Sequence, residues 1–283
     1  MPTPLPARLH DLRAYLDGLV DRFERPSFIA PDPISIPHGF DDPEDRAIIG
    51  LYAALLAWGQ RPTMLRKLNE LCERMQYRPA AFVQGYRPSR DAERLDGFKH
   101  RTFQPTDAHW LTRALSEGLR QHGSVERLFA RHLPATATDV GPAIQGFSAT
   151  LLTFVPGTPA RLRKHLAQPD RGSACKRLAM YLRWMVRPGP VDFGLWTSIR
   201  PAQLVLPLDV HAGRQARALG FLHRSQNDWR AVQELTEACR RLDPTDPARY
   251  DFAFYGAGAH GVELDPAWTG QNRLAVTSAP TVR

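Results

Sequence analysis

The chain is poor in cysteine and has no long apolar run. Its three cysteines, Cys72, Cys175 and Cys239, are far apart, and none belongs to a CxxC pair. This spacing excludes a four-cysteine zinc or iron–sulfur site within the chain and is typical of reduced thiols in the cytoplasm. The sequence has no stretch of about 18 apolar residues to span a membrane, and residues 1–6 lack the basic start of a signal peptide. We therefore expect a cytoplasmic protein without a membrane segment.

Acidic residues are fewer than basic ones. The sequence has 37 lysines and arginines against 29 aspartates and glutamates, which gives a formal net charge of +8. Such an excess favours a polyanionic partner such as nucleic acid. Many basic proteins bind no nucleic acid, so composition alone favours DNA or RNA binding no more than its absence. Hydrophobic residues make up 43% of the 283 residues, which is enough for one large core or two smaller ones.

Strand signals are scarce in this sequence. Residues 204–206 form the best short apolar run, and Pro207 stops it. Elsewhere the apolar residues recur at helical spacing, first from Leu9 to Val20. A nearly all-apolar helix is expected to start at the acidic residues 42–45 and to end at Gly59. Further helices are expected after residue 61 and near 80–85, 107–122, 124–131 and 141–153. The sequence therefore predicts an all-α protein with little or no sheet.

A turn followed by a basic helix is the first candidate site. Residues 169–173 are typical of a tight turn, and Ser173 is a suitable N-cap for a helix over about 174–186. Lys176 lies in the first turn of this helix. At about 100° per residue, Arg183 and Arg187 share its side, with Trp184 alongside and the main apolar stripe elsewhere. A solvated lysine is the ordinary interpretation, although a turn with free N–H groups beside a basic stripe also suits a phosphate.

An aspartate at a helix start is the second candidate. The apolar segment 205–208 leads into Asp209, and residues 210–219 are expected to form a helix that Gly220 ends. Asp209 is a natural N-cap, a role that contributes about 1 kcal/mol. A carboxylate held by backbone N–H groups stays ionised and rigid, so capping is compatible with catalysis. His211 on the same helix is expected to support packing or capping.

Together these two segments resemble the helix-hairpin-helix DNA glycosylase superfamily. The Asp209-Val210-His211 start is similar to the Val-Asp-Thr-His start of its endonuclease III branch, and residues 48–60 resemble its early helix, which ends in a glutamine near the lesion. The separation of 33 residues (209 minus 176) and the missing cluster cysteines are closer to the archaeal 8-oxoguanine glycosylase branch. The hairpin at 168–173 departs from the usual Gly-apolar-Gly pattern. The chain also resembles a related bacterial family of unassigned function, through residues 176–187 and 246–253.

The resemblance implies an all-α fold with two helical lobes, a helix-hairpin-helix motif and an active-site cleft between the lobes. One lobe, residues 46–187, would end in the hairpin and Lys176. The second, residues 1–45 plus 188–264, would carry Asp209. Residues 265–283 lose the helical periodicity and are expected to form a flexible tail.

The chemistry implied is that of a bifunctional DNA glycosylase and AP lyase. Such an enzyme excises an oxidised purine, 8-oxoguanine, after flipping it out of double-stranded DNA. Lys176 would attack the anomeric carbon of the sugar as a neutral amine, and Asp209 would stabilise the cationic sugar and assist proton transfer. A Schiff base and β-elimination would follow. We expect a monomer that needs no metal and no redox cofactor.

Further site residues follow from the same resemblance. A flipped purine needs aromatic faces and polar groups at its edge, although tryptophans at helical spacing are more often core residues. The residues expected to contact the base are Gln60, Trp58, Trp184 and Trp196. The residues expected to contact DNA are Arg171, Gly172, Ser173, Arg177, Arg183, Arg187, His211 and Arg214. The basic and aromatic run at 98–103 is equally consistent with a DNA contact and with a solvated loop.

Two other functions remain open at this point. One is a glycosylase for another lesion, such as an oxidised pyrimidine or an alkylated purine. The other is a non-catalytic helix-hairpin-helix protein that binds DNA, which would need the basic stripe but not Asp209. A fold alone does not decide among them.

Overall fold

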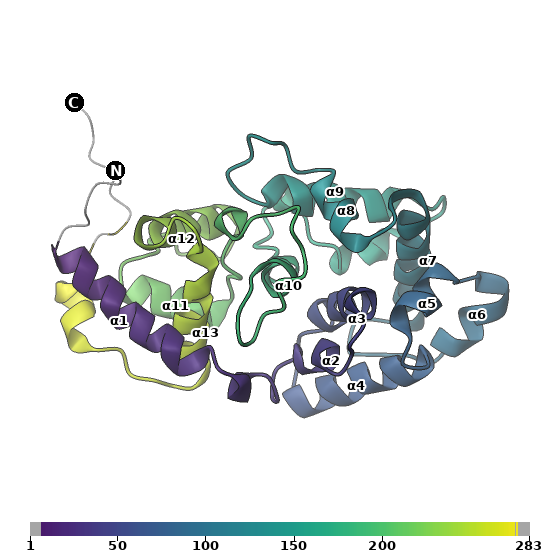
Figure 1. The fold of residues 1–283 in the computed structure, drawn as a ribbon, viewed down its shortest axis with the longest axis horizontal. Helices are drawn as coiled ribbons and strands as arrows, with labels where there is room; N and C mark the ends of the chain where they lie inside the picture. The colour runs from purple at the N-terminus through teal and green to yellow at the C-terminus, as the bar shows by residue number, and fades with distance from the viewer. Residues whose placement is uncertain (1–6, 275, 277–283) are drawn as a thin grey trace. The chain divides into compact units, whose positions relative to one another are not determined.

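Helices form all the regular structure of the described residues, 7–274 and 276, in this computed structural model (Figure 1). Thirteen α-helices and seven short 3-10 helices are present in this part of the chain, with three isolated β-bridges and no strand. The predicted all-α class is confirmed. No described helix has the length and apolar character to cross a membrane.

The described chain divides into two units, each with its own core. Unit 1 takes in residues 1–26, 169–193 and 200–283, and unit 2 takes in residues 27–168 and 194–199. The helices of unit 1 are α1 (Ala7–Phe23), α10 (Lys176–Val186), α11 (Val210–Ala218), α12 (Trp229–Leu242) and α13 (Asp251–Ala259). The helices of unit 2 are α2 (Ser35–His38), α3 (Pro43–Leu55), α4 (Arg61–Arg74), α5 (Pro79–Gln84), α6 (Pro88–Leu95), α7 (Pro105–His122), α8 (Val125–Ala130) and α9 (Gly141–Thr153).

In unit 1, α13 packs against both α1 and α11 (Figure 1). Two glycines of α13 allow this close approach. A Cβ on Gly258 would lie 3.0 Å from the carbonyl oxygen of His211 in α11, and a Cβ on Gly256 would clash with the ring of Phe23 in α1. Because interiors are close-packed, neither position has room for a larger residue. This packing fixes α11, the helix that begins after Asp209.

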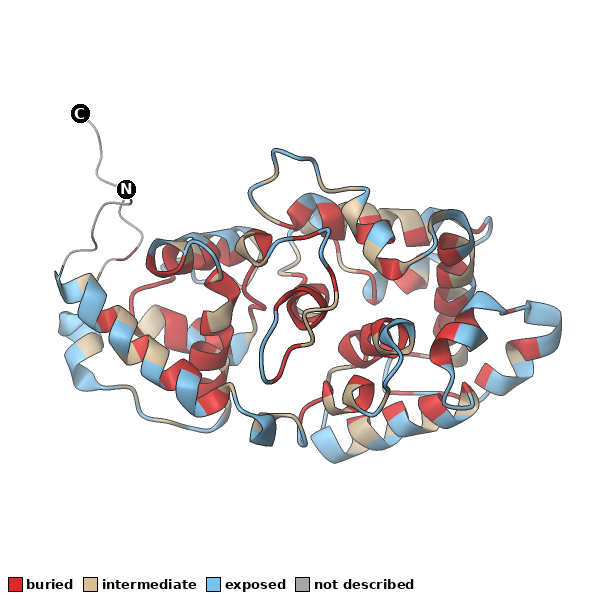
Figure 2. Ribbon diagram, in the orientation of Figure 1, coloured by how far each residue is buried: buried red, intermediate tan, exposed pale blue. Residues whose placement is uncertain are grey.

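In unit 2, α3 is the buried helix that the sequence predicts. Asp42 caps it and accepts hydrogen bonds from the amides of Glu44 and Asp45, both at 2.9 Å. All nine residues from Ala47 to Leu55 are buried, and Figure 2 shows the helix largely in red. Helices near 107–122 and 141–153 are confirmed as α7 and α9.

The division of the chain differs from the expected lobes of 46–187 and of 1–45 plus 188–264. Residues 169–193 belong to unit 1, because buried ion pairs join α10 to the rest of that unit. Arg187, which directly follows α10, pairs with Glu24, just after α1, and Arg183 pairs with Asp251 at the start of α13. Residues 27–45 belong instead to unit 2, where α2 packs against α3. Periodicity along a helix carries no information about such distant partners.

The predicted tail at 265–283 has regular structure in its first part. Residues Pro266–Trp268 and Gly270–Asn272 form 3-10 helices. The amide of Asp265 donates to the hydroxyl of Tyr15 at 3.1 Å, and the ring of Trp268 stacks on Tyr15. Residues 275 and 277–283 lie outside the described part of the chain.

Candidate functional site

Lys176 is the first residue of α10. The turn before it is tight, since Gly172 and Cys175 both have left-handed backbone conformations, with φ of 74° and 49°. The expected N-cap, Ser173, is corrected here, because Cys175 occupies the cap position and makes no side-chain cap bond. The hydroxyl of Ser173 instead accepts a hydrogen bond from the amide of Cys175 at 3.2 Å. A cap is set by backbone conformation as well as residue type, so Ser173 lies two residues too early.

The segment before α10 is only briefly helical. A 3-10 helix, Ala160–Lys164, and a three-residue turn, Pro169–Arg171, precede it. The chain then forms an isolated bridge between Ser173 and Asp228, the residue before α12. The loop that presents Lys176 is therefore anchored on the start of α12.

Asp209 caps α11, as the sequence predicts. Its Oδ1 accepts hydrogen bonds from the amides of His211 and Ala212 at 2.9 and 3.0 Å. The backbone of Asp209 is held as well, because the Asn227 side-chain amide donates to its carbonyl at 3.0 Å. Arg217 in turn donates to Asn227 Oδ1 at 2.6 Å. Sequence reasoning missed Asn227, because the carbonyl that it holds lies 18 residues earlier in the chain.

The structure brings Lys176 and Asp209 together within unit 1. Lys176 Nζ lies 3.9 Å from Asp209 Oδ2, and the two side chains are 25% and 24% exposed. The ammonium also lies 3.3 Å from the Met180 sulfur and 5.5 Å from the centroid of the Tyr255 ring. The pair is thus accessible from solvent on one side and enclosed by α10 and α13 on the other. Tyr255 is a second residue that sequence reasoning missed.

Two of the three residues of the expected basic stripe, Arg183 and Arg187, do not face solvent. Arg183 and Arg187 are only 3% and 5% exposed, and Figure 2 shows α10 mostly in red. Arg183 pairs with Asp192 at 3.3 Å and with Asp251. Arg187 pairs with Glu24, with Asp192 at 3.2 Å and with Asp246 at 2.7 Å. The assignment of these two arginines to DNA contacts is therefore corrected, because their guanidinium groups already bind buried carboxylates.

Asp251 is a buried acid close to the candidate pair, and sequence reasoning gave it no role. It begins α13 and is 4% exposed. Burial raises its pKa to about 6, although the charges of Arg183 and Lys176 oppose this rise and that of Asp209 adds to it. A raised pKa among several charged groups is typical of functional sites and also of structural ion-pair networks.

The four expected base contacts have different surroundings. Trp184 has no exposed surface, so its ring is part of the core of unit 1, where its indole N–H finds no acceptor among the described residues. Trp196 is buried in unit 2 with its ring 5.8 Å from that of Phe129. Both are therefore corrected to core residues, as is common for tryptophan at helical spacing.

Trp58 and Gln60 belong to unit 2 and are more accessible. Trp58 is half-buried, and its ring stacks on that of His165 with 5.8 Å between centroids. Gln60 is exposed at the start of α4 and makes no side-chain cap bond. In the run at 98–103, Phe98 and Phe103 are fully buried, so its aromatic residues are core residues rather than a DNA-contacting surface.

The remaining expected DNA contacts cluster near the two helix starts. Arg171 and Gly172 are exposed, whereas Ser173 and Arg177 are half-buried. His211 and Arg214 of α11 both reach the carbonyl of Gly258, at 3.2 and 3.5 Å. The His211 ring also meets Tyr255 edge-on at 6.3 Å. His211 therefore contacts α13 as its expected supporting role requires, and because it is exposed its expected DNA contact stays a prediction.

The donor set offers no obvious metal site. Within residues 7–274 and 276, no group of three or more histidine, cysteine, aspartate or glutamate side chains is placed to hold a metal ion.

Comparisons with known proteins give one match. No curated protein and no solved structure matches the chain. A family profile described as "Protein of unknown function (DUF2400)" matches residues 32–260, which include both candidate residues and most of both units. The chain therefore belongs to the DUF2400 family.

Proposed function

We propose that this protein is a DNA glycosylase with AP lyase activity that removes an oxidised purine, 8-oxoguanine, from double-stranded DNA. One observation carries the proposal. Lys176 and Asp209 lie 33 positions apart in the sequence, yet only 3.9 Å separates Lys176 Nζ from Asp209 Oδ2 in the structure. An accessible amine beside a fixed carboxylate is the pair that covalent cleavage of a glycosidic bond requires.

The rigidity of Asp209 supports this role. Two backbone amides hold its carboxylate and Asn227 holds its carbonyl, so the group is oriented before a substrate arrives. Its second oxygen, Oδ2, faces the lysine and can take the proton that the amine must lose. Preorganised groups of this kind need little rearrangement during reaction.

The proposed reaction consists of attack on the sugar, opening of the sugar ring and β-elimination. The lone pair of the Lys176 amine attacks C1′ of the flipped nucleotide, and the bond from C1′ to the base breaks with its electron pair leaving on the base, which takes up a proton. The C1′–O4′ bond then breaks and one proton passes from the nitrogen to O4′, which opens the sugar ring and leaves a protonated Schiff base between C1′ and Nζ. Loss of a proton from C2′ expels the 3′ phosphate and nicks the strand. Asp209 is placed to stabilise the cationic sugar and to carry protons in these steps.

The non-catalytic alternative has less support. It relied on a basic stripe along α10, and two of the three residues of that stripe are buried and paired with carboxylates. Arg171 and Arg214 are exposed near the two helix starts and are available for phosphate contacts that position DNA. A glycosylase for another lesion keeps the same pair and differs only in the base that it accepts.

A panel of duplexes, each with a single lesion, tests the proposed function. We expect base release and strand nicking on the 8-oxoguanine duplex, and little on undamaged DNA. Faster release from an oxidised pyrimidine or an alkylated purine would move the substrate to that class. Salt-dependent binding without base release from any lesion would favour the non-catalytic alternative.

A further inference from the structure

A tight turn in unit 2, residues 100–103, lies between α6 and the start of α7. Its ends form an isolated bridge, in which the amides of His100 and Phe103 donate to each other's carbonyls at 3.0 and 2.9 Å. Phe103 is fully buried and His100 is 2% exposed. Arg101 and Thr102, at the tip, are exposed. The turn is thus anchored at both ends and presents its tip to solvent.

The backbone of the tip is fixed by other side chains. The side-chain amide of Gln104 donates to the Arg101 carbonyl at 3.0 Å. Arg161, which pairs with the buried carboxylate of Asp107 at 2.8 Å, donates to the Thr102 carbonyl at 3.2 Å. Arg101 itself has a left-handed backbone conformation, with φ of 52°, which is uncommon for a residue with a side chain. Such conformations persist where the surroundings hold them, and they cluster at functional sites.

The side chain of Arg101 lies over the segment that links α3 to α4. A Cβ on Gly59 would lie 3.0 Å from Arg101 Cδ and 3.1 Å from Arg101 Nη1, so the missing side chain leaves room for the guanidinium. His100 joins the same two segments, because its Nε2 donates to the carbonyl of Trp58 at 2.9 Å. The guanidinium therefore lies beside the backbone between Trp58 and Gln60, the two expected base contacts that are accessible.

Three segments without any acidic residue meet at this turn. Residues 57–69, 97–106 and 157–169 contain lysines and arginines but no aspartate or glutamate. They meet because the Trp58 ring stacks on that of His165 and lies 5.2 Å from that of His100. Arg101 forms no ion pair with the described residues. Its charge is therefore available to an anion, in surroundings that repel cations.

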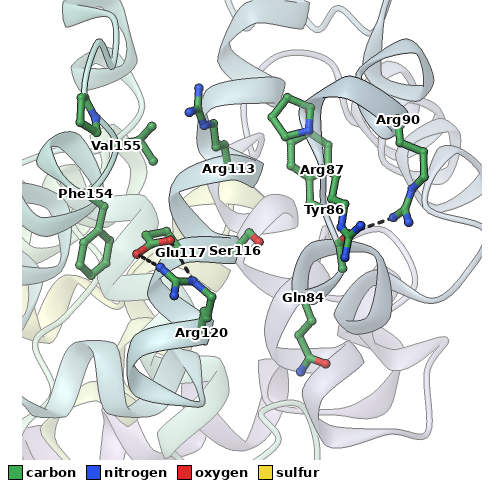
Figure 3. Close-up of a pocket in the computed structure, with 13 residues that line it drawn as sticks. Gln84, Tyr86, Arg87, Arg90, Arg113, Ser116, Glu117, Arg120, Phe154 and Val155 are labelled. Atoms are coloured by element: carbon green, nitrogen blue, oxygen red, sulfur yellow. Dashed lines mark hydrogen bonds and ion pairs between the residues drawn. The ribbon is translucent and has the colours of Figure 1, made fainter.

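The open pocket lined by α7 and the turn between α5 and α6 provides a contrast. There the exposed Arg120 pairs with Glu117 at 2.5 Å (Figure 3), and the exposed Arg90 pairs with Asp91 at 2.8 Å. Such pairs reduce the local excess of positive charge that attracts a polyanion. The tip of the 100–103 turn has no such partner among the described residues.

We propose that Arg101 binds a backbone phosphate of the DNA substrate. Its guanidinium presents a planar fork of donors that suits the oxygens of a phosphate. The phosphate belongs to the strand beside the nucleotide that Trp58 and Gln60 are expected to contact, and the rigid turn fixes the register of the duplex there. The inference rests on the proposed function, because it takes DNA as the substrate. It adds a contact from unit 2 that is independent of α10.

Fluorescence anisotropy with a short labelled duplex measures this contact on the full chain. The logarithm of the binding constant falls linearly with the logarithm of the salt concentration, by about 0.9 for each neutralised phosphate. Arg101→Gln should therefore reduce this slope by about 0.9 and weaken binding about three- to tenfold at about 100 mM salt. Arg101→Lys keeps the charge and should keep the slope.

Arg120→Gln is the matched control, because it removes the same charge from a position that has a carboxylate partner. Arg120 lies in the last turn of α7, whereas the 100–103 turn precedes the first residue, Pro105. Fifteen residues at about 1.5 Å each separate the two positions by roughly 22 Å. The salt slope of this variant should equal that of the wild type.

Arg101→Gly separates the contact from a role in folding. Glycine adopts the left-handed conformation without strain, so the turn should keep its shape. The melting temperature should be at least that of Arg101→Gln, and the duplex should bind as weakly as it does to that variant. Binding by Arg101→Gly as tight as that of the wild type would overturn the proposed contact.

Two further outcomes distinguish this contact from the proposed function. Equal salt slopes for Arg101→Gln and Arg120→Gln, with intact binding by the wild type, would overturn the contact alone. Failure of the wild type to bind either an undamaged or an 8-oxoguanine duplex would overturn both. Tighter binding of duplex RNA than of DNA, lost in Arg101→Gln, would overturn the contact with DNA in favour of RNA.

Discussion

Asp209→Asn should lower the single-turnover rate of base release by about 10²- to 10⁴-fold, the usual contribution of a positioned acid or base. The variant keeps the hydrogen-bonding shape of the cap, because asparagine caps helices about as well as aspartate. Only the charge and the proton-accepting capacity are lost. The free energy of unfolding should therefore change by less than about 0.5 kcal/mol. Rapid-quench kinetics on the 8-oxoguanine duplex and urea unfolding measure the two effects.

Asp228→Asn is the matched control for this prediction. Asp228 caps α12 in the same unit and accepts from the amide of Ala231 at 3.0 Å, but it pairs with Arg224 and not with the lysine. Its substitution should leave the rate of base release close to that of the wild type. If Asp209→Asn and Asp228→Asn had the same rate, the carboxylate of Asp209 would be a cap only.

Arg187→Met should lower the free energy of unfolding by about 3–5 kcal/mol, because it leaves buried carboxylates without their counter-ion. Glu24 loses both hydrogen bonds to this guanidinium, and Asp192 and Asp246 each lose one. Burial already raises the pKa of Asp246 despite the opposing charge of Arg187. Without that charge the carboxyl group would be still harder to ionise. Urea unfolding monitored by circular dichroism gives the change directly.

An exposed arginine of the same unit provides the comparison. Arg230→Met on α12 should change the free energy of unfolding by less than about 0.5 kcal/mol. A loss below about 1 kcal/mol for Arg187→Met would contradict a structural role for the ion-pair network. Weaker DNA binding of that variant with unchanged stability would restore Arg187 as a phosphate contact.

The two arginines show where sequence reasoning reached its limit. Helical periodicity predicts that Arg183 and Arg187 share a side with Lys176, and in the structure Arg187 directly follows the last residue of α10. Periodicity does not say what covers that side. Their partners come from segments before and after α10, such as Glu24 and Asp251, and only the tertiary fold brings these acids to the helix. A basic stripe that looks exposed in sequence is therefore a buried network in the structure.

The sequence predicts best those features whose physical cause lies within a few neighbouring residues. The cap of α11 at Asp209 and the start of α3 at Asp42 depend on a side chain and the next three amides, and both are confirmed. The cap of α10 failed because the left-handed conformation of Cys175 has no strong sequence signature. Asn227 was missed because its role depends on a contact 18 residues away in sequence.

Borohydride trapping tests the covalent role of Lys176 most directly. Hydride reduces the Schiff base to a stable secondary amine, so the wild-type protein should form a covalent adduct with the 8-oxoguanine duplex. The adduct should disappear in Lys176→Gln and persist in Lys99→Gln, which changes an exposed lysine of unit 2. Mass spectrometry of the digested adduct should place the reduced sugar on Lys176. An adduct that persists in Lys176→Gln, or no adduct of the wild type with any lesion duplex, would contradict the assignment.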